Sequence, residues 1–141
     1  MRLWQWIAAV GLAGLAACGG PAAGGGGAGV NAFTGTITVT SALPAGTTTC
    51  ASTQTVTFTA AGADIHAVSI AGGGCIKFTN GDTADHQPAA RASNPCPALD
   101  APGPLHGGAS FTTQPLGAAS GTETCDWQDL LNPPGSGGGG Y

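Results

Sequence analysis

The sequence is poor in charged residues, and above all in positively charged ones. Lys and Arg together number three among 141 residues, against seven Asp and Glu, and the formal net charge is −4. Binding to nucleic acid calls for a basic stripe or patch, so this balance excludes that class of partner. Catalytic patterns are also lacking, because there is no Ser/His/Asp order, paired-carboxylate signature, phosphate-cradling loop or HExxH motif. We therefore expect no enzyme.

Long apolar runs are missing too. The apolar run at residues 7–17 is too short to span a bilayer comfortably and follows a single cation, Arg2. It ends in Leu-Ala-Ala-Cys at residues 15–18, which resembles the bacterial lipobox. We predict a signal peptide at 1–17 and a lipidated Cys18 that anchors the chain to a membrane. The expected location is the bacterial cell envelope, on the periplasmic or outer-membrane face, with an ordinary secretory signal as the alternative.

Glycine is abundant, with 26 residues, but it gathers near the two ends of the chain. Residues 18–32 are rich in Gly and Ala, which predicts a flexible tether. Residues 134–141 are mostly Gly and predict a flexible tail. A single ordered domain is therefore expected at residues 33–133.

Within that domain the apolar residues recur with period two. Thr-Ile-Thr-Val-Thr at 36–40 and Thr-Val-Thr-Phe-Thr at 55–59 alternate, as do shorter segments at 68–70 and 76–78. Two further strands are expected at 109–114 and 121–127, and glycine-rich turns separate the strands. The pattern predicts an all-β fold, an antiparallel β-sandwich. Its expected core is Ile37, Val56, Phe58, Val68, Ile70, Ile76, Phe78, Phe111, Leu116 and Trp127.

This core is thin for about 100 ordered residues, and disulfides are expected to supplement it. Besides Cys18 the chain holds four cysteines, Cys50, Cys75, Cys96 and Cys125. Four cysteines permit three pairings. We favour Cys50 with Cys75 and Cys96 with Cys125, although the sequence alone does not fix the choice.

Several segments resemble a protein family. Residues 56–88 hold strand segments, a glycine turn and then Asn80-x-Asp82-x-x-x-His86, and they look like the first half of a small bacterial cupredoxin. Residues 94–100, 108–111 and 124–133 resemble successive pieces of the second half. The resemblance implies a Greek-key antiparallel β-sandwich of six to eight strands. It further implies copper binding or electron transfer, with a redox or copper-donor protein as partner.

The family holds one copper ion through two histidines, a cysteine thiolate and often a weak axial ligand. His86 matches the first histidine and Cys125 the thiolate. Gln128 and Leu130 stand where the family pattern has histidines. Gln128 is a weak axial candidate, and His106 a weak candidate to replace the second imidazole; the expected exposure of His66 makes it a surface residue.

The alternative to copper binding is a metal-free β-sandwich stapled by disulfides, which would act as a binding or structural module of the envelope. The two hypotheses differ in what they require of Cys125. A bond between Cys96 and Cys125 would leave no thiolate for a blue-copper site.

Overall fold

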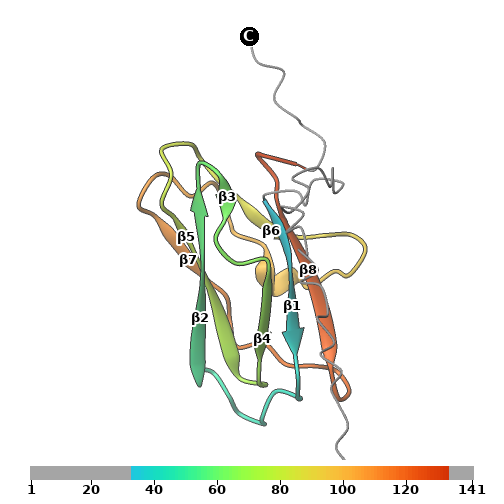
Figure 1. The fold of residues 1–141 in the computed structure, drawn as a ribbon. Coiled ribbons are helices and arrows are strands. Elements are labelled where there is room, and N and C mark those ends of the chain that lie inside the picture. The colour runs from blue at the N-terminus through green and yellow to red at the C-terminus, as the bar shows by residue number, and fades with distance from the viewer. Residues whose placement is uncertain (1–32, 134–141) are drawn as a thin grey trace, which may run out of the picture.

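The computed structural model describes residues 33–133, which form a sandwich of two four-stranded sheets (Figure 1). The predicted signal peptide, Cys18, the tether and the tail lie outside the described residues. Among residues 33–133 no helix has the length and apolar character needed to cross a membrane. One sheet has the strand order β4 (Ala67–Ile70), β1 (Thr34–Val39), β8 (Glu123–Asp129), β6 (Pro88–Ala90). The other has the order β3 (Gly62–Ala63), β2 (Ser52–Thr59), β5 (Gly74–Asn80), β7 (Ser110–Thr112), and a 3₁₀ helix, η1 (Pro97–Leu99), lies between β6 and β7.

The period-two pattern of the sequence is the pattern of burial in the strands. In β2, Val56 and Phe58 are buried while the threonines beside them reach the surface. Alternation of this kind gives each sheet one apolar face, and the two faces meet in a single core. The predicted all-β sandwich is confirmed. Of the ten residues predicted for the core only Phe111 is half-buried rather than buried; Val39, Leu99 and Leu105 are further core residues.

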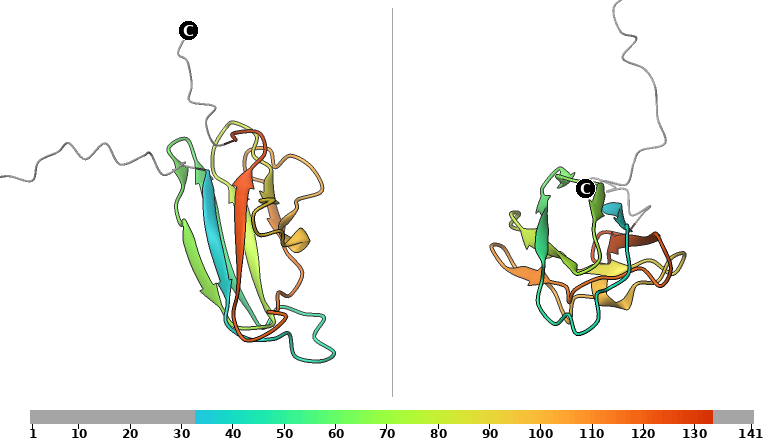
Figure 2. Two further views of the ribbon diagram at one scale, coloured as in Figure 1. Left: turned by 90° about the vertical axis from the view of Figure 1, so that its right-hand side faces the viewer. Right: turned by 90° about the horizontal axis from the view of Figure 1, so that it is seen from below.

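The pairing of the strands differs from a purely antiparallel sandwich. β1 pairs with β4 in parallel and β2 with β5 in parallel, so both sheets are mixed. The cause lies in the connections, because β2 and β3 are the only consecutive strands in 33–133 that belong to one sheet. Residues 40–51, for example, carry the chain from β1 across to β2 in the other sheet (Figures 1 and 2). Period-two alternation is the same in parallel and antiparallel strands, so the sequence pattern does not report this feature.

Aromatic rings join the two sheets at the centre. Trp127 of β8 packs edge-on against Phe58 of β2 and Phe78 of β5, with ring centroids 5.8 and 5.4 Å apart. All three side chains are fully buried. Edge-to-face pairs of this kind add to the free energy gained by burying the rings.

Both disulfides that we favoured are present. Cys50, just before β2, is bonded to Cys75 in β5, and Cys96, just before η1, is bonded to Cys125 in β8. The bonded residues are separated by 25 and 29 positions. Loops of this size correspond to about 3 to 4 kcal/mol of stabilisation each in the chain-entropy model.

We expect Gly35→Ala to destabilise the fold. A Cβ atom at this position would lie 2.5 Å from the His66 carbonyl oxygen and 2.7 Å from Trp127 Nε1, so the core would have to shift. Overpacking of this kind costs about 1 to 3 kcal/mol in the free energy of unfolding, measurable by urea denaturation. Gly103→Ala is the matched control, because a Cβ there meets nothing within 4 Å. Equal stabilities of the two variants would contradict the close packing of β1 on Trp127.

Candidate functional site

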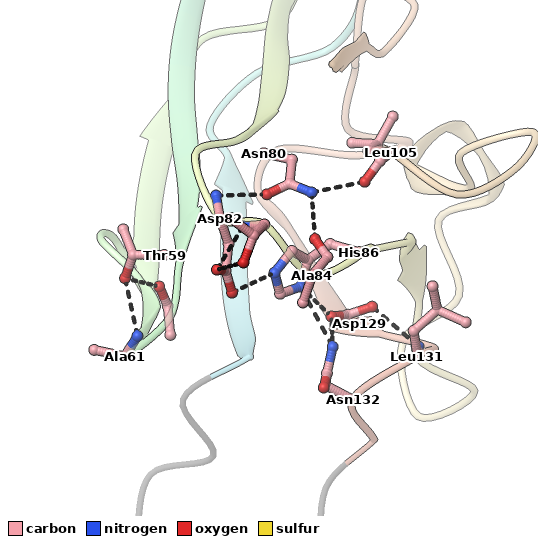
Figure 3. Close-up of polar contacts among 12 residues, drawn as sticks. Thr59, Ala61, Asn80, Asp82, Ala84, His86, Leu105, Asp129, Leu131 and Asn132 are labelled. Atoms are coloured by element: carbon pink, nitrogen blue, oxygen red, sulfur yellow. Dashed lines mark hydrogen bonds and ion pairs between the residues drawn. The ribbon is translucent and has the colours of Figure 1, made fainter. Parts of the chain in front are cut away.

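The segment that carries His86 is held in place by Asn80, the last residue of β5. The fully buried Asn80 side chain donates from Nδ2 to the carbonyl oxygens of Ala84 and Leu105, both at 2.7 Å. Its Oδ1 accepts a hydrogen bond from the Asp82 N–H (Figure 3). One amide thereby ties two loops together, and backbone hydrogen bonds between His86 and Leu105 continue the connection. The spacing Asn80-x-Asp82-x-x-x-His86 fixes the position of the imidazole for this reason.

His86 lies inside the sandwich with 1% of its side chain exposed. Its ring stacks on Phe58, with centroids 4.7 Å apart and planes 12° from parallel, and on Phe33 at 5.1 Å. Nδ1 donates to Asp129 Oδ2 at 2.6 Å, and Nε2 faces Asp82 Oδ2 at 3.4 Å (Figure 3). Both ring nitrogens are therefore directed at carboxylates.

Asp129, the last residue of β8, is fully buried and accepts four hydrogen bonds. The donors are His86 Nδ1, Asn132 Nδ2 and the backbone N–H groups of Gln87 and Leu131. Burial alone acts to raise the pKa of this carboxyl, because it disfavours the charged form. The hydrogen bonds outweigh burial, and the pKa of Asp129 lies below its ordinary value.

Asp82 is the second carboxylate beside His86. Its Oδ1 accepts from the Thr83 N–H at 2.6 Å, the main cause of a lowered pKa for Asp82, and the contact with His86 acts in the same direction. Asp129 contacts one ring nitrogen of His86, and Asp82 contacts the other. The arrangement is a hydrogen-bonded unit that ties the 80–87 loop to the end of β8.

Cys125 and Gln128 do not belong to the cluster of side chains around His86. Cys125 is bonded to Cys96 and has no thiolate in this state. Side chains alternate along β8, so the buried Asp129 faces inward whereas Gln128, half-buried, faces the outer side of the sheet. Leu130, at the second histidine position of the family pattern, is 46% exposed.

The other two histidines are surface residues with partners of their own. His66 Nδ1 contacts the Thr34 carbonyl oxygen at 2.7 Å. His106 follows Leu105, whose backbone is hydrogen-bonded to that of His86, so the loop that carries His106 lies beside His86. Its ring nevertheless turns outward, is 77% exposed and contacts Asp85 at 2.8 Å.

These placements do not fit a blue-copper site in the disulfide-bonded state. Such a site requires two imidazoles and a thiolate directed at one point. Here the one buried imidazole faces two carboxylates, and the sulfur of Cys125 is in a covalent bond to Cys96. Among residues 33–133, the group of His, Cys, Asp and Glu side chains able to share a metal ion is Cys96, Glu123 and Cys125, without His86. The copper ligand set implied by the resemblance stays a prediction.

Sequence reasoning missed Asp129, the residue that organises the site. The predicted strand at 121–127 ends two residues too early, since β8 continues to Asp129. Extending the alternation of Cys125 and Trp127 by one more step would have placed Asp129 on the inner face, opposite the loop of His86. The partnership itself has no signature in the sequence, because 43 residues separate the two side chains.

Comparison with protein-family models, with curated proteins and with solved structures finds no match to this chain. The resemblance to cupredoxins therefore depends on the segments quoted above.

We expect Asp129→Ala to destabilise the domain by about 3 to 5 kcal/mol, because it leaves a buried imidazole and two backbone donors without their acceptor. The measurement is urea denaturation with the disulfides intact. Asp126→Ala is the matched control on the same strand: its carboxylate accepts from Ser93 and Asn94 at the surface, and its loss should cost about 1 kcal/mol. A cost at position 129 no larger than at 126 would contradict the central role of Asp129.

The lowered pKa values of Asp82 and Asp129 predict a loss of stability in acid. A carboxyl with a lower pKa in the folded state stabilises the fold above its unfolded pKa, about 3.9 for Asp, and the contribution disappears as pH falls through the folded pKa. The free energy of unfolding should therefore decline below about pH 4. Asp129→Asn should flatten this decline, and an unchanged slope between about pH 5 and pH 2.5 would argue against the assignment.

Proposed function

We propose that this chain is a disulfide-stapled β-sandwich that works without a metal in its oxidised form, as a binding or structural module displayed on the bacterial cell envelope. The observation that carries the proposal is the Cys96–Cys125 bond, which occupies the sulfur that copper would require. The buried His86 supports it, since its ring ties Asp82 to Asp129. In this proposal His86 contributes to stability rather than to ligand binding.

The side chains on the surface of the domain favour binding to polar, weakly charged partners. On the outer face of the β2 sheet, Thr55 and Thr57 pair with Lys77 and Thr79 of the neighbouring strand. These outward positions carry hydroxyl groups and one cation. Hydroxyl groups both donate and accept hydrogen bonds, which suits contact with neutral polar surfaces.

Attachment to the envelope rests on the lipobox-like sequence at 15–18, together with the use of disulfides, which persist in oxidising compartments. Lipidation at Cys18 would place the sandwich at the end of the Gly- and Ala-rich segment 18–32, which has a typical reach of roughly 20 Å if it behaves as a flexible coil. The copper-binding electron carrier implied by the resemblance is the competing function, and the two differ in measurable ways.

The test is a count of free thiols under denaturing conditions, on the chain carrying Cys18→Ala and exported to an oxidising compartment. We expect no free thiol and no change of melting temperature on adding one equivalent of copper, because a bonded Cys125 is not a ligand. Two free thiols, one of them Cys125, with a copper-dependent absorbance band would overturn the proposal.

The histidines supply the matched controls for the copper titration. A copper-induced shift in melting temperature that disappears in His86→Ala but persists in His106→Ala would assign copper to the family site and reject the metal-free module. A shift that disappears only in His106→Ala would mark a surface contact of the exposed imidazole, with the buried site still free of metal.

A further inference from the structure

A second cluster of reactive side chains lies on β8, away from His86. Glu123 and Cys125 are two residues apart, so both side chains leave the same face of the strand, and Cys96 reaches that face from the loop before η1. One potential ligand atom from each of the three residues lies within 4.8 Å of the others. Two sulfurs and a carboxylate oxygen are a donor set that zinc accepts in proteins.

The carboxylate of Glu123 is held in position. Its Oε2 accepts a hydrogen bond from the Ala119 N–H at 2.9 Å, while Oε1 lies 4.0 Å from Cys96 Sγ. One oxygen therefore anchors the group and the other faces the sulfurs. On the opposite side, the Cys96 carbonyl oxygen accepts from the Leu99 N–H at 2.9 Å, which fixes the backbone that carries the second sulfur. The Glu123 carboxylate and the Cys96 backbone are thereby positioned before a metal arrives.

The cluster opens into a cavity of about 300 Å³. Besides the three ligand residues, the cavity is lined mainly by apolar side chains, among them Val39, Leu43 and Leu116. The volume admits an ion with a water molecule as a fourth ligand, and the apolar lining lowers the competition from bulk water. Cys96 and Cys125 are both buried but line this cavity, which is therefore the route by which a small reductant would approach the disulfide.

We propose that Cys96, Cys125 and Glu123 form a zinc site that the disulfide masks and that reduction opens. A dithiol reductant supplies two electrons and two protons to the disulfide, is itself oxidised to a disulfide, and leaves two thiols on the protein. Zn²⁺ then displaces both thiol protons and binds two thiolates and Glu123 Oε1. The Cα atoms of the two cysteines are 5.7 Å apart, and small side-chain rotations bring the sulfurs to the separation of about 3.8 Å set by tetrahedral Zn–S bonds.

This inference goes beyond the proposed function, because it concerns the reduced chain and leaves the oxidised chain free of metal. The two fail on different measurements. Copper binding to the oxidised chain would overturn the metal-free module and leave the zinc site untouched. Absence of zinc binding after reduction would overturn the zinc site and leave the metal-free module untouched.

The test compares two double variants in the chain carrying Cys18→Ala. Cys50→Ser with Cys75→Ser keeps the proposed ligands, and Cys96→Ser with Cys125→Ser keeps the other cysteine pair, which does not belong to the three-ligand cluster. Each is reduced with a dithiol, freed of reductant without oxygen, and titrated with Co²⁺, whose thiolate charge-transfer absorbance reports the ligands. Zn²⁺ is then added to displace Co²⁺.

We expect one ion per chain only in the reduced variant that keeps Cys96 and Cys125, and none before reduction. Adding Glu123→Gln should weaken binding about tenfold or more, the scale on which even outer-shell partners affect metal sites. Equal binding by both double variants, or none by the first, would overturn the proposal. Near-UV circular dichroism shows whether the chain loses its structure on reduction. Recovery of the signal on adding Zn²⁺ would support the site, and an unfolded chain that binds no zinc would refute it.

Discussion

The alternation of side chains along β8 is the constraint on which the rest of the domain depends. Its inner face carries Cys125, Trp127 and Asp129 in succession. The first is bonded to the loop before η1, the second fills the centre between the sheets, and the third holds the loop of His86. A slip of one residue in the register of β8 would turn all three outward at once. A single strand therefore couples the covalent, apolar and polar parts of the fold.

A chain with so few charges nevertheless buries ionisable groups at the end where β2 and β8 finish. The arrangement is tolerable because His86, Asp129 and Asn80 satisfy one another and the nearby backbone almost completely. A buried network of this kind restricts the loops to one conformation, since any other leaves a polar group without a partner. The polar cluster thus holds the loops together, as the aromatic rings hold the two sheets together.

Much of the fold follows from local pattern, and much of the site does not. The sequence predicted six of the eight strands, four of them from period-two alternation, and nine of the ten residues predicted for the core are buried, because burial of one strand face repeats every second residue. β3 and β6 are too short to show it, with two and three residues. The family pattern pointed to Gln128 and Leu130 as the positions of the metal ligands. Because side chains alternate along β8, the inward position belongs to Asp129, which lies between them in the sequence. Partnerships such as Cys96 with Glu123 depend on how the loop before η1 returns to β8, which no local pattern encodes.

The connectivity of the two disulfides affects how easily the native bridges form as the domain folds. Each bridge joins cysteines that follow one another along the domain, Cys50 with Cys75 and then Cys96 with Cys125. A chain that emerges from a translocation channel amino terminus first presents each pair in turn, so oxidation in order of emergence gives the native connectivity. In a chain exported in this way, oxidation in that order would form both bridges without reshuffling of wrong ones, a step that takes minutes to hours without a catalyst.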